Sequence, residues 1–131
     1  MNNKDLIDIA KNTCKPMKLR DNFSSGEVGC AILSESGKIY TGVCIDLASG
    51  LGFCAEAAAI AEMLKNGESK IIKLAAAFSN GNVEAPCGRC REMIIQINKD
   101  NKNTKIILDI NKEILLIDLL PNHWLEKYEK N

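Results

Sequence analysis

The chain has 131 residues, and its 17 basic and 17 acidic side chains cancel to a formal net charge of zero. The chain therefore has no excess of positive charge with which to bind a nucleic-acid backbone or an anionic membrane. No apolar run approaches the roughly 18 residues needed to span a bilayer. The length predicts a single domain, 1–131, that buries a core of its own.

The first predicted element is a helix over residues 4–15, because Leu6, Ile9 and Ala10 recur at helical spacing before Pro16. This start is charged and amphipathic and has no signal-peptide core. We therefore expect a cytoplasmic protein, whose six cysteines are thiols or metal ligands rather than disulfides.

The next stretch, 16–27, is interpreted as a loop, and 28–47 predicts a β-hairpin: two apolar runs around the Ser36-Gly37 turn. An Ala-rich segment from Cys54 then predicts a helix that ends at Gly67. The elements predicted after it are a strand over 70–79, a helix over 87–98, a strand over 104–110, and a strand or short helix over 112–121. This alternation predicts a mixed α/β layer fold.

Three cysteines are placed where helices are predicted to begin. Cys87 and Cys90 form a C-x-x-C pair, and Cys54 starts the preceding predicted helix. Each segment follows a strand and a loop, so both helix starts could meet at one edge of the sheet. Helix N-termini lower the pKa of thiols, and zinc prefers thiolate and imidazole ligands. The pattern therefore favours a zinc site.

Such a zinc could be structural or catalytic. A structural zinc needs four protein ligands, whereas a catalytic zinc keeps an open position for water. The cysteines and histidine left over as a fourth ligand form no second close pair; they are Cys14, Cys30, Cys44 and His123. Glu56, two residues past Cys54, is placed to reach water without being a ligand. Three ligands and Glu56 favour catalysis, and a structural module stays the non-enzyme alternative.

The order of these residues, C-x-E followed by P-C-x-x-C, matches the zinc-deaminase pattern, with Cys54 where a histidine is usual. The chain resembles the small homotetrameric cytidine deaminases and the related blasticidin S deaminases. The resemblance runs from "VGCAILSESGKIYTGV" through "CAEAAAIAEMLKNG" and "PCGRCRE" to "DLLP". It implies a three-layer α/β fold, a mixed five-stranded sheet with helices on both faces. It also implies one Zn²⁺ per chain on Cys54, Cys87 and Cys90, with Glu56 moving protons.

The function implied is hydrolytic deamination of cytidine or 2′-deoxycytidine to the uracil nucleoside and ammonia, in a cytoplasmic homotetramer. The second enzymatic reading is a blasticidin S-like deaminase that acts on another cytosine nucleoside. Neither reading involves a nucleic-acid polymer or a membrane.

Several positions depart from the family pattern around the substrate. The usual N-x-E that holds the ribose is "CID", so Cys44 replaces the Asn while Asp46 keeps a carboxylate. Ala55 is expected to contact the substrate. Gly26 stands where an aromatic usually packs against the base, and Phe23 lies three residues away.

The arginine that commonly follows the catalytic glutamate is Ala57 here. Because three thiolates on Zn²⁺ leave a net charge of −1, Arg89 and Arg91 are the available replacements to neutralise the sulfurs. In "LLPNHW", Trp124 holds the position of an aromatic that reaches a neighbouring subunit's pocket; the alternative is that it caps the core. His123 is interpreted as a surface residue.

Overall fold

The computed structural model describes residues 1–128 and is built around one mixed sheet. Its six strands are β1 (Met17–Arg20), β2 (Phe23–Ser34), β3 (Ile39–Asp46), β4 (Ile71–Phe78), β5 (Lys105–Asp109) and β6 (Lys112–Leu115). The main order across the sheet is β3-β2-β4-β5-β6. Only β4 and β5 pair in parallel, and the other pairs among the described strands are antiparallel.

The predicted loop over 16–27 and the count of five strands were wrong, because β1 pairs with the start of β2. The strand β1 lies on the edge of β2 opposite β3, beside Phe23–Ser25, and β4 takes over that edge from Val28 onward. All four residues of β1 are exposed, and its apolar–polar alternation is only four residues long, so it was not recognised as a strand. The sheet is therefore five strands wide, with β1 added beyond the end of β4.

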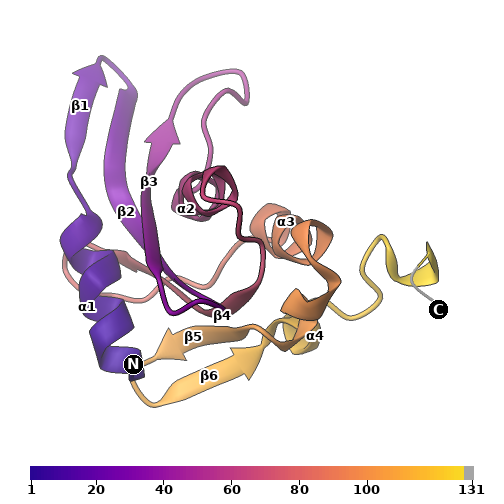
Figure 1. Ribbon diagram of the computed structural model, residues 1–131. Coiled ribbons are helices and arrows are strands. Elements are labelled where there is room, and N and C mark those ends of the chain that lie inside the picture. The colour runs from indigo at the N-terminus through magenta and orange to yellow at the C-terminus, as the bar shows by residue number, and fades with distance from the viewer. Residues whose placement is uncertain (129–131) are drawn as a thin grey trace.

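Helices cover both faces of this sheet, as predicted (Figure 1). They are α1 (Asn3–Thr13), α2 (Ala55–Lys65), α3 (Gly88–Ile97) and the short α4 (Leu116–Leu119), with 3₁₀ turns at Lys99–Asn103 and Glu126–Tyr128. The segment over 112–121 is thus a strand and then a helix. The helix α1 packs on one face, and α2 and α3 pack on the other.

Small residues on the sheet let the helices approach closely. Beneath α1 the strands present alanines, among them Ala31 and Ala75, which are fully buried. On the other face, a Cβ added to Gly42 of β3 would lie 2.4 Å from the backbone nitrogen of Ala59 in α2. Only glycine permits this contact between backbones, which holds α2 tightly against β3. The contact sets how closely α2 packs on β3.

No helix among the described residues is long and apolar enough to cross a membrane.

Candidate active site

The sulfurs of Cys54, Cys87 and Cys90 converge at one point. The Sγ atoms of Cys54 and Cys87 are 3.5 Å apart, and those of Cys87 and Cys90 are 3.7 Å apart. All three sulfurs lie within 4.8 Å of one another. Within residues 1–128, this group that could hold a metal ion has no fourth Cys, His, Asp or Glu.

Two helix N-termini bring these sulfurs together. Cys54 is the N-cap of α2 and Cys87 is the N-cap of α3; neither side chain caps its own helix. Their sulfurs are therefore left for another partner at the positive ends of two helix dipoles. Cys90 lies in the first turn of α3 and is buried, so it supplies the third sulfur from the protein side of the group.

The donor set fits zinc. Three sulfurs at about 2.3 Å from a tetrahedral zinc would lie roughly 3.8 Å apart, close to the separations seen here. The chain alone also crowds negative charge at this point. Burial and the neighbouring charges of Glu56, Cys54 and Cys87 raise the pKa of the Cys90 thiol far above its usual value. A divalent cation would relieve that crowding and would hold the thiols as thiolates.

The two N-cap thiols differ in their surroundings. Burial opposes ionisation of Cys87, but hydrogen bonds from backbone N–H groups of Cys90 and Arg89 and from the neighbouring thiols bring its pKa below the usual value. For Cys54, burial and the hydrogen bond with Cys87 raise the pKa. Cys87 is thus the sulfur most ready to act as an anion before any metal arrives.

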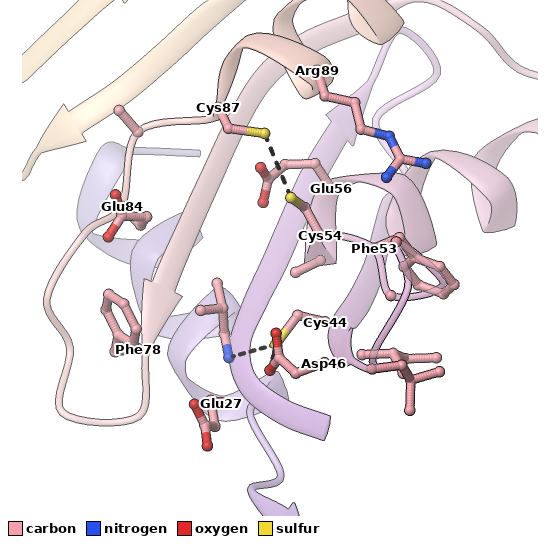
Figure 2. A pocket seen from close by; sticks show the side chains of 17 residues that line it. Glu27, Cys44, Asp46, Phe53, Cys54, Glu56, Phe78, Glu84, Cys87 and Arg89 are labelled. Carbon is pink, nitrogen blue, oxygen red and sulfur yellow. Dashed lines mark hydrogen bonds between the residues drawn. The ribbon is translucent and has the colours of Figure 1, made fainter. Parts of the chain in front are cut away.

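Glu56 lies beside the sulfurs in the first turn of α2 and is only 4% exposed (Figure 2). Burial raises the pKa of its carboxyl group, and the negative charge of Glu84 adds to the rise; a hydrogen bond from the Cys90 thiol acts in the opposite direction. A buried carboxyl group whose ionised form is disfavoured can accept a proton and return it. The local arrangement therefore suits acid–base chemistry.

A cavity of about 560 Å³ opens above Cys54, Cys87 and Glu56. Its walls come from the ends of β2 and β3, the loop before α2, and the loop between β4 and α3. A bridge between Ile45 and Phe53 holds the loop before α2 against β3. Cys54, Cys87 and Glu56 thus lie where a small molecule can reach them.

Known proteins of one family match this chain. Residues 1–105 match the family described as "Cytidine and deoxycytidylate deaminase zinc-binding region". The chain belongs to this family. Cytidine deaminase of Mycoplasma genitalium is 31% identical over 125 residues, which cover 91% of this chain and 89% of that protein. Cytidine deaminase of Mycobacterium tuberculosis is 35% identical over 75 residues, and that match spans 56% of each chain.

Solved structures of cytidine deaminases share the fold. The Mycobacterium tuberculosis enzyme superposes with a TM-score of 0.78 at 28% identity, covering 92% of this chain and 95% of that one. The enzyme from Burkholderia pseudomallei gives a TM-score of 0.76 at 28% identity, covering 95% and 100%. The predicted fold and the predicted membership of a zinc-dependent deaminase family are thus confirmed.

Of the residues expected at the substrate, Cys44, Asp46 and Ala55 line the cavity of this deaminase-family chain. The Cys44 sulfur accepts from the backbone N–H of Val28 at 3.4 Å, and its thiol faces a carboxylate oxygen of Asp46 at 3.7 Å. The thiol therefore links strand β2 to the carboxylate at the end of β3.

Trp124 does not line this cavity and is 67% exposed, so it does not cap the core. Its backbone N–H donates to Glu92, and its ring lies against Tyr128. His123 beside it is 8% exposed, so the expectation of a surface residue was wrong. The turn after Leu120 folds His123 inward and leaves Trp124 outside.

The two arginines have different surroundings. Arg89 lines the cavity, whereas Arg91 donates from Nε to the carbonyl of Pro86 at 2.9 Å and from a terminal nitrogen to the carbonyl of Leu119 at 3.3 Å. Arg91 thus holds the start of α3 against the end of α4. These hydrogen bonds go to carbonyl oxygens rather than to the sulfurs.

The aromatic and acidic residues of the cavity wall that sequence reasoning missed are Phe53, Phe78, Glu27 and Glu84. At Gly26, where the family's aromatic was sought, φ is +80° and an added Cβ would lie 2.0 Å from the carbonyl oxygen of Lys15. No side chain fits there. Phe53 and Phe78 are therefore the aromatic residues that could pack against the ring of a bound substrate. Phe53 could have been found, because it directly precedes the ligand Cys54.

Proposed function

We propose that this chain is a zinc-dependent hydrolase that converts a cytosine nucleoside, cytidine or 2′-deoxycytidine, and water into the uracil nucleoside and ammonia. The observation that carries the proposal is Glu56, buried beside a set of three cysteine sulfurs at the floor of an open cavity. The family membership supports the same reaction, and curated relatives are named cytidine deaminase.

Cys54, Cys87 and Cys90 would hold the metal. When bound, zinc lowers the pKa of water to about 7 and so supplies a nucleophile at neutral pH. Glu56 accepts a proton from the attacking water and delivers it to N3, as oxygen bonds to C4 of the ring. Glu56 then takes the proton of the new C4 hydroxyl and passes it to the amino group; the C4–N bond breaks, ammonia leaves, and a carbonyl remains at C4. Phe53 and Phe78 enclose the ring, and Asp46 is placed to accept from a sugar hydroxyl.

A blasticidin S-like deaminase is the second candidate, because Cys44 replaces the ribose-binding Asn and the sequence "PCGRCR" is shared with that group. A structural zinc module is disfavoured by the absence of a fourth ligand within residues 1–128. The test is incubation of the zinc-loaded protein with cytidine, 2′-deoxycytidine, blasticidin S and adenosine, with ammonia release followed. Release from none of the cytosine nucleosides would refute the proposal.

We further propose that four copies assemble and that Trp124 completes a neighbour's cavity. Its exposed ring supports this, as does exposed Leu51 near the cavity. Light scattering should give the mass of a tetramer, and an active monomer would contradict it. We place the enzyme in the cytoplasm, because its six cysteines are free thiols and the reducing cytoplasm keeps them so.

A further inference from the structure

The cavity carries more negative charge than the reaction needs. Besides Glu56, it is lined by Glu27 from β2, Asp46 from the end of β3, and Glu84 from the loop between β4 and α3 (Figure 2). Of the residues that the structure describes around the cavity, Arg89 alone carries a positive charge. Three carboxylates against one guanidinium leave a formal charge of −2 before Glu56 is counted.

The backbone fixes Glu84 in this wall. Its N–H donates to the carbonyl of Ala76 at 2.8 Å, and a bridge between Ala77 and Val83 ties the loop to β4. Glu84 lines the same cavity as Glu56 (Figure 2). Glu84 is therefore close enough to act on a ligand bound beside Glu56.

A β-bulge places Glu27. The pairing of β2 with β3 shifts between Ser25 and Gly29, and Gly26 adopts a positive φ of +80°. Lys15 locks the bulge, since its N–H donates to the carbonyl of Gly26 at 2.9 Å. Bulges re-aim side chains next to active sites, and here the bulge sets Glu27 and Val28 in the cavity wall.

We propose that Glu84, together with Glu27, is a specificity-determining residue that makes the site select cytosine nucleosides with an uncharged or positively charged sugar substituent and reject 5′-phosphates. This inference rests on the proposed deaminase function. It bears on a choice that the family leaves open, because the family description covers both cytidine and deoxycytidylate deaminases.

The expected size follows from Coulomb's law. A carboxylate about 8 Å from a phosphate with two negative charges disfavours it by about fivefold in a water-like dielectric. At an effective dielectric constant near 20 the same pair gives a factor of about a thousand. We therefore expect Glu84 to contribute about tenfold discrimination, which lies between these limits, and we expect a singly charged amine to gain by the square root of that factor.

The experiment compares kcat/KM of the zinc-loaded wild type and Glu84→Gln on three substrates with the same ring: cytidine, cytidine 5′-monophosphate and 5′-amino-5′-deoxycytidine. The wild type should prefer the amine over cytidine and cytidine over the phosphate. In Glu84→Gln, the phosphate-to-cytidine ratio should rise about tenfold and the amine-to-cytidine ratio should fall about threefold. Any effect of Glu84 on Glu56 cancels in these ratios, because all three substrates undergo the same chemistry.

Glu35→Gln is the matched control. It removes the same charge at the turn end of the β2–β3 hairpin, where Glu35 makes only a surface ion pair with Lys70 at 3.8 Å. Its ratios should equal those of the wild type. High salt should shrink the effect of Glu84→Gln, because salt screens exposed charges. Glu27→Gln should shift both ratios in the same direction as Glu84→Gln.

Unchanged ratios in Glu84→Gln, or an equal shift in Glu35→Gln, would overturn the inference. A wild type inactive on all three compounds would instead contradict the proposed function. The selectivity would then be measured by calorimetry of the same three compounds with the zinc-loaded protein. Binding of the phosphate as tight as that of cytidine would overturn the inference, and weaker binding that Glu84→Gln restores would support it.

Discussion

Replacing Glu56 by glutamine tests whether this carboxylate moves the protons of the reaction. Glutamine fills the same buried volume but cannot accept and return a proton. Proton transfer by a positioned side chain contributes roughly 10²–10⁴-fold to a rate. Because one carboxylate serves the water, the ring nitrogen and the leaving amine, we expect kcat to fall by at least about 10⁴-fold. That loss corresponds to about 5.4 kcal/mol of transition-state stabilisation.

The stability of the same variant separates a proton carrier from a structural residue. Burial raises the pKa of Glu56, so its ionised form costs folding free energy at neutral pH, and the uncharged amide removes that cost. The melting temperature of the zinc-free variant should therefore stay level or rise. A glutamate that served only the dipole of α2 would instead lose about 0.3–1 kcal/mol on replacement and leave turnover intact.

The assay measures zinc content, melting temperature and cytidine turnover for wild type and Glu56→Gln. Glu62→Gln, an exposed change on the same helix, is the control and should behave as wild type. Near-normal turnover by zinc-loaded Glu56→Gln would refute the reasoning. Loss of zinc from this variant would refute it too, because the carboxylate would then be a ligand.

Three other changes test the metal site and the packing around it. Alanine replacement should abolish zinc binding, measured by atomic absorption, at Cys54, Cys87 and Cys90, and should leave it intact at Cys14, Cys30 and Cys44. Gly42→Ala should lower the free energy of unfolding in urea by about 1–3 kcal/mol, because the new Cβ meets the backbone of α2; an unchanged midpoint would deny that close packing. Glu68→Gln should destabilise the protein at neutral pH, by a difference that vanishes as the pH falls from about 4.5 to about 2. Hydrogen bonds from Tyr40 first, then from Ser36 and Ser34, lower the pKa of Glu68 to about 2, so its contribution is complete above the unfolded value and is lost on acidification. Thermal melts of the wild type and Glu68→Gln across this pH range check the prediction. A difference in melting temperature that stays constant with pH would contradict it.

The metal site could be predicted from the sequence because its signals are local. Helix starts at Cys54 and Cys87, a C-x-x-C pair and a glutamate in the first turn can each be recognised within a few residues. The predicted meeting of the two helix starts needed only the alternation of strands and helices, and the sulfurs do meet. The hairpin over 28–47 was recognised for the same reason, since both strands carry apolar runs around a turn.

The cavity wall could not be predicted, because it depends on loops and on pairing between distant segments. Phe78 ends β4, and Glu84 returns to the site through a bridge between Ala77 and Val83, a pairing that has no local sequence signal. The strand β1 is only four residues long and fully exposed, and the inward turn of His123 depends on a loop between two helical segments. These features are set by tertiary contacts rather than by local preference.

The charge of the metal site can be balanced without the arginine that Ala57 replaces. Three thiolates on Zn²⁺ leave an excess charge of −1. The guanidinium of Arg91 donates its hydrogen bonds to the carbonyls of Pro86 and Leu119 rather than to the sulfurs. The N-termini of α2 and α3 both lie at this set, because Cys54 and Cys87 are their N-caps, and each helix end carries roughly half a positive charge. Together they match the excess in size. The two helix ends that gather the ligands therefore also stabilise their charge, which is how an alanine can follow Glu56 in this chain.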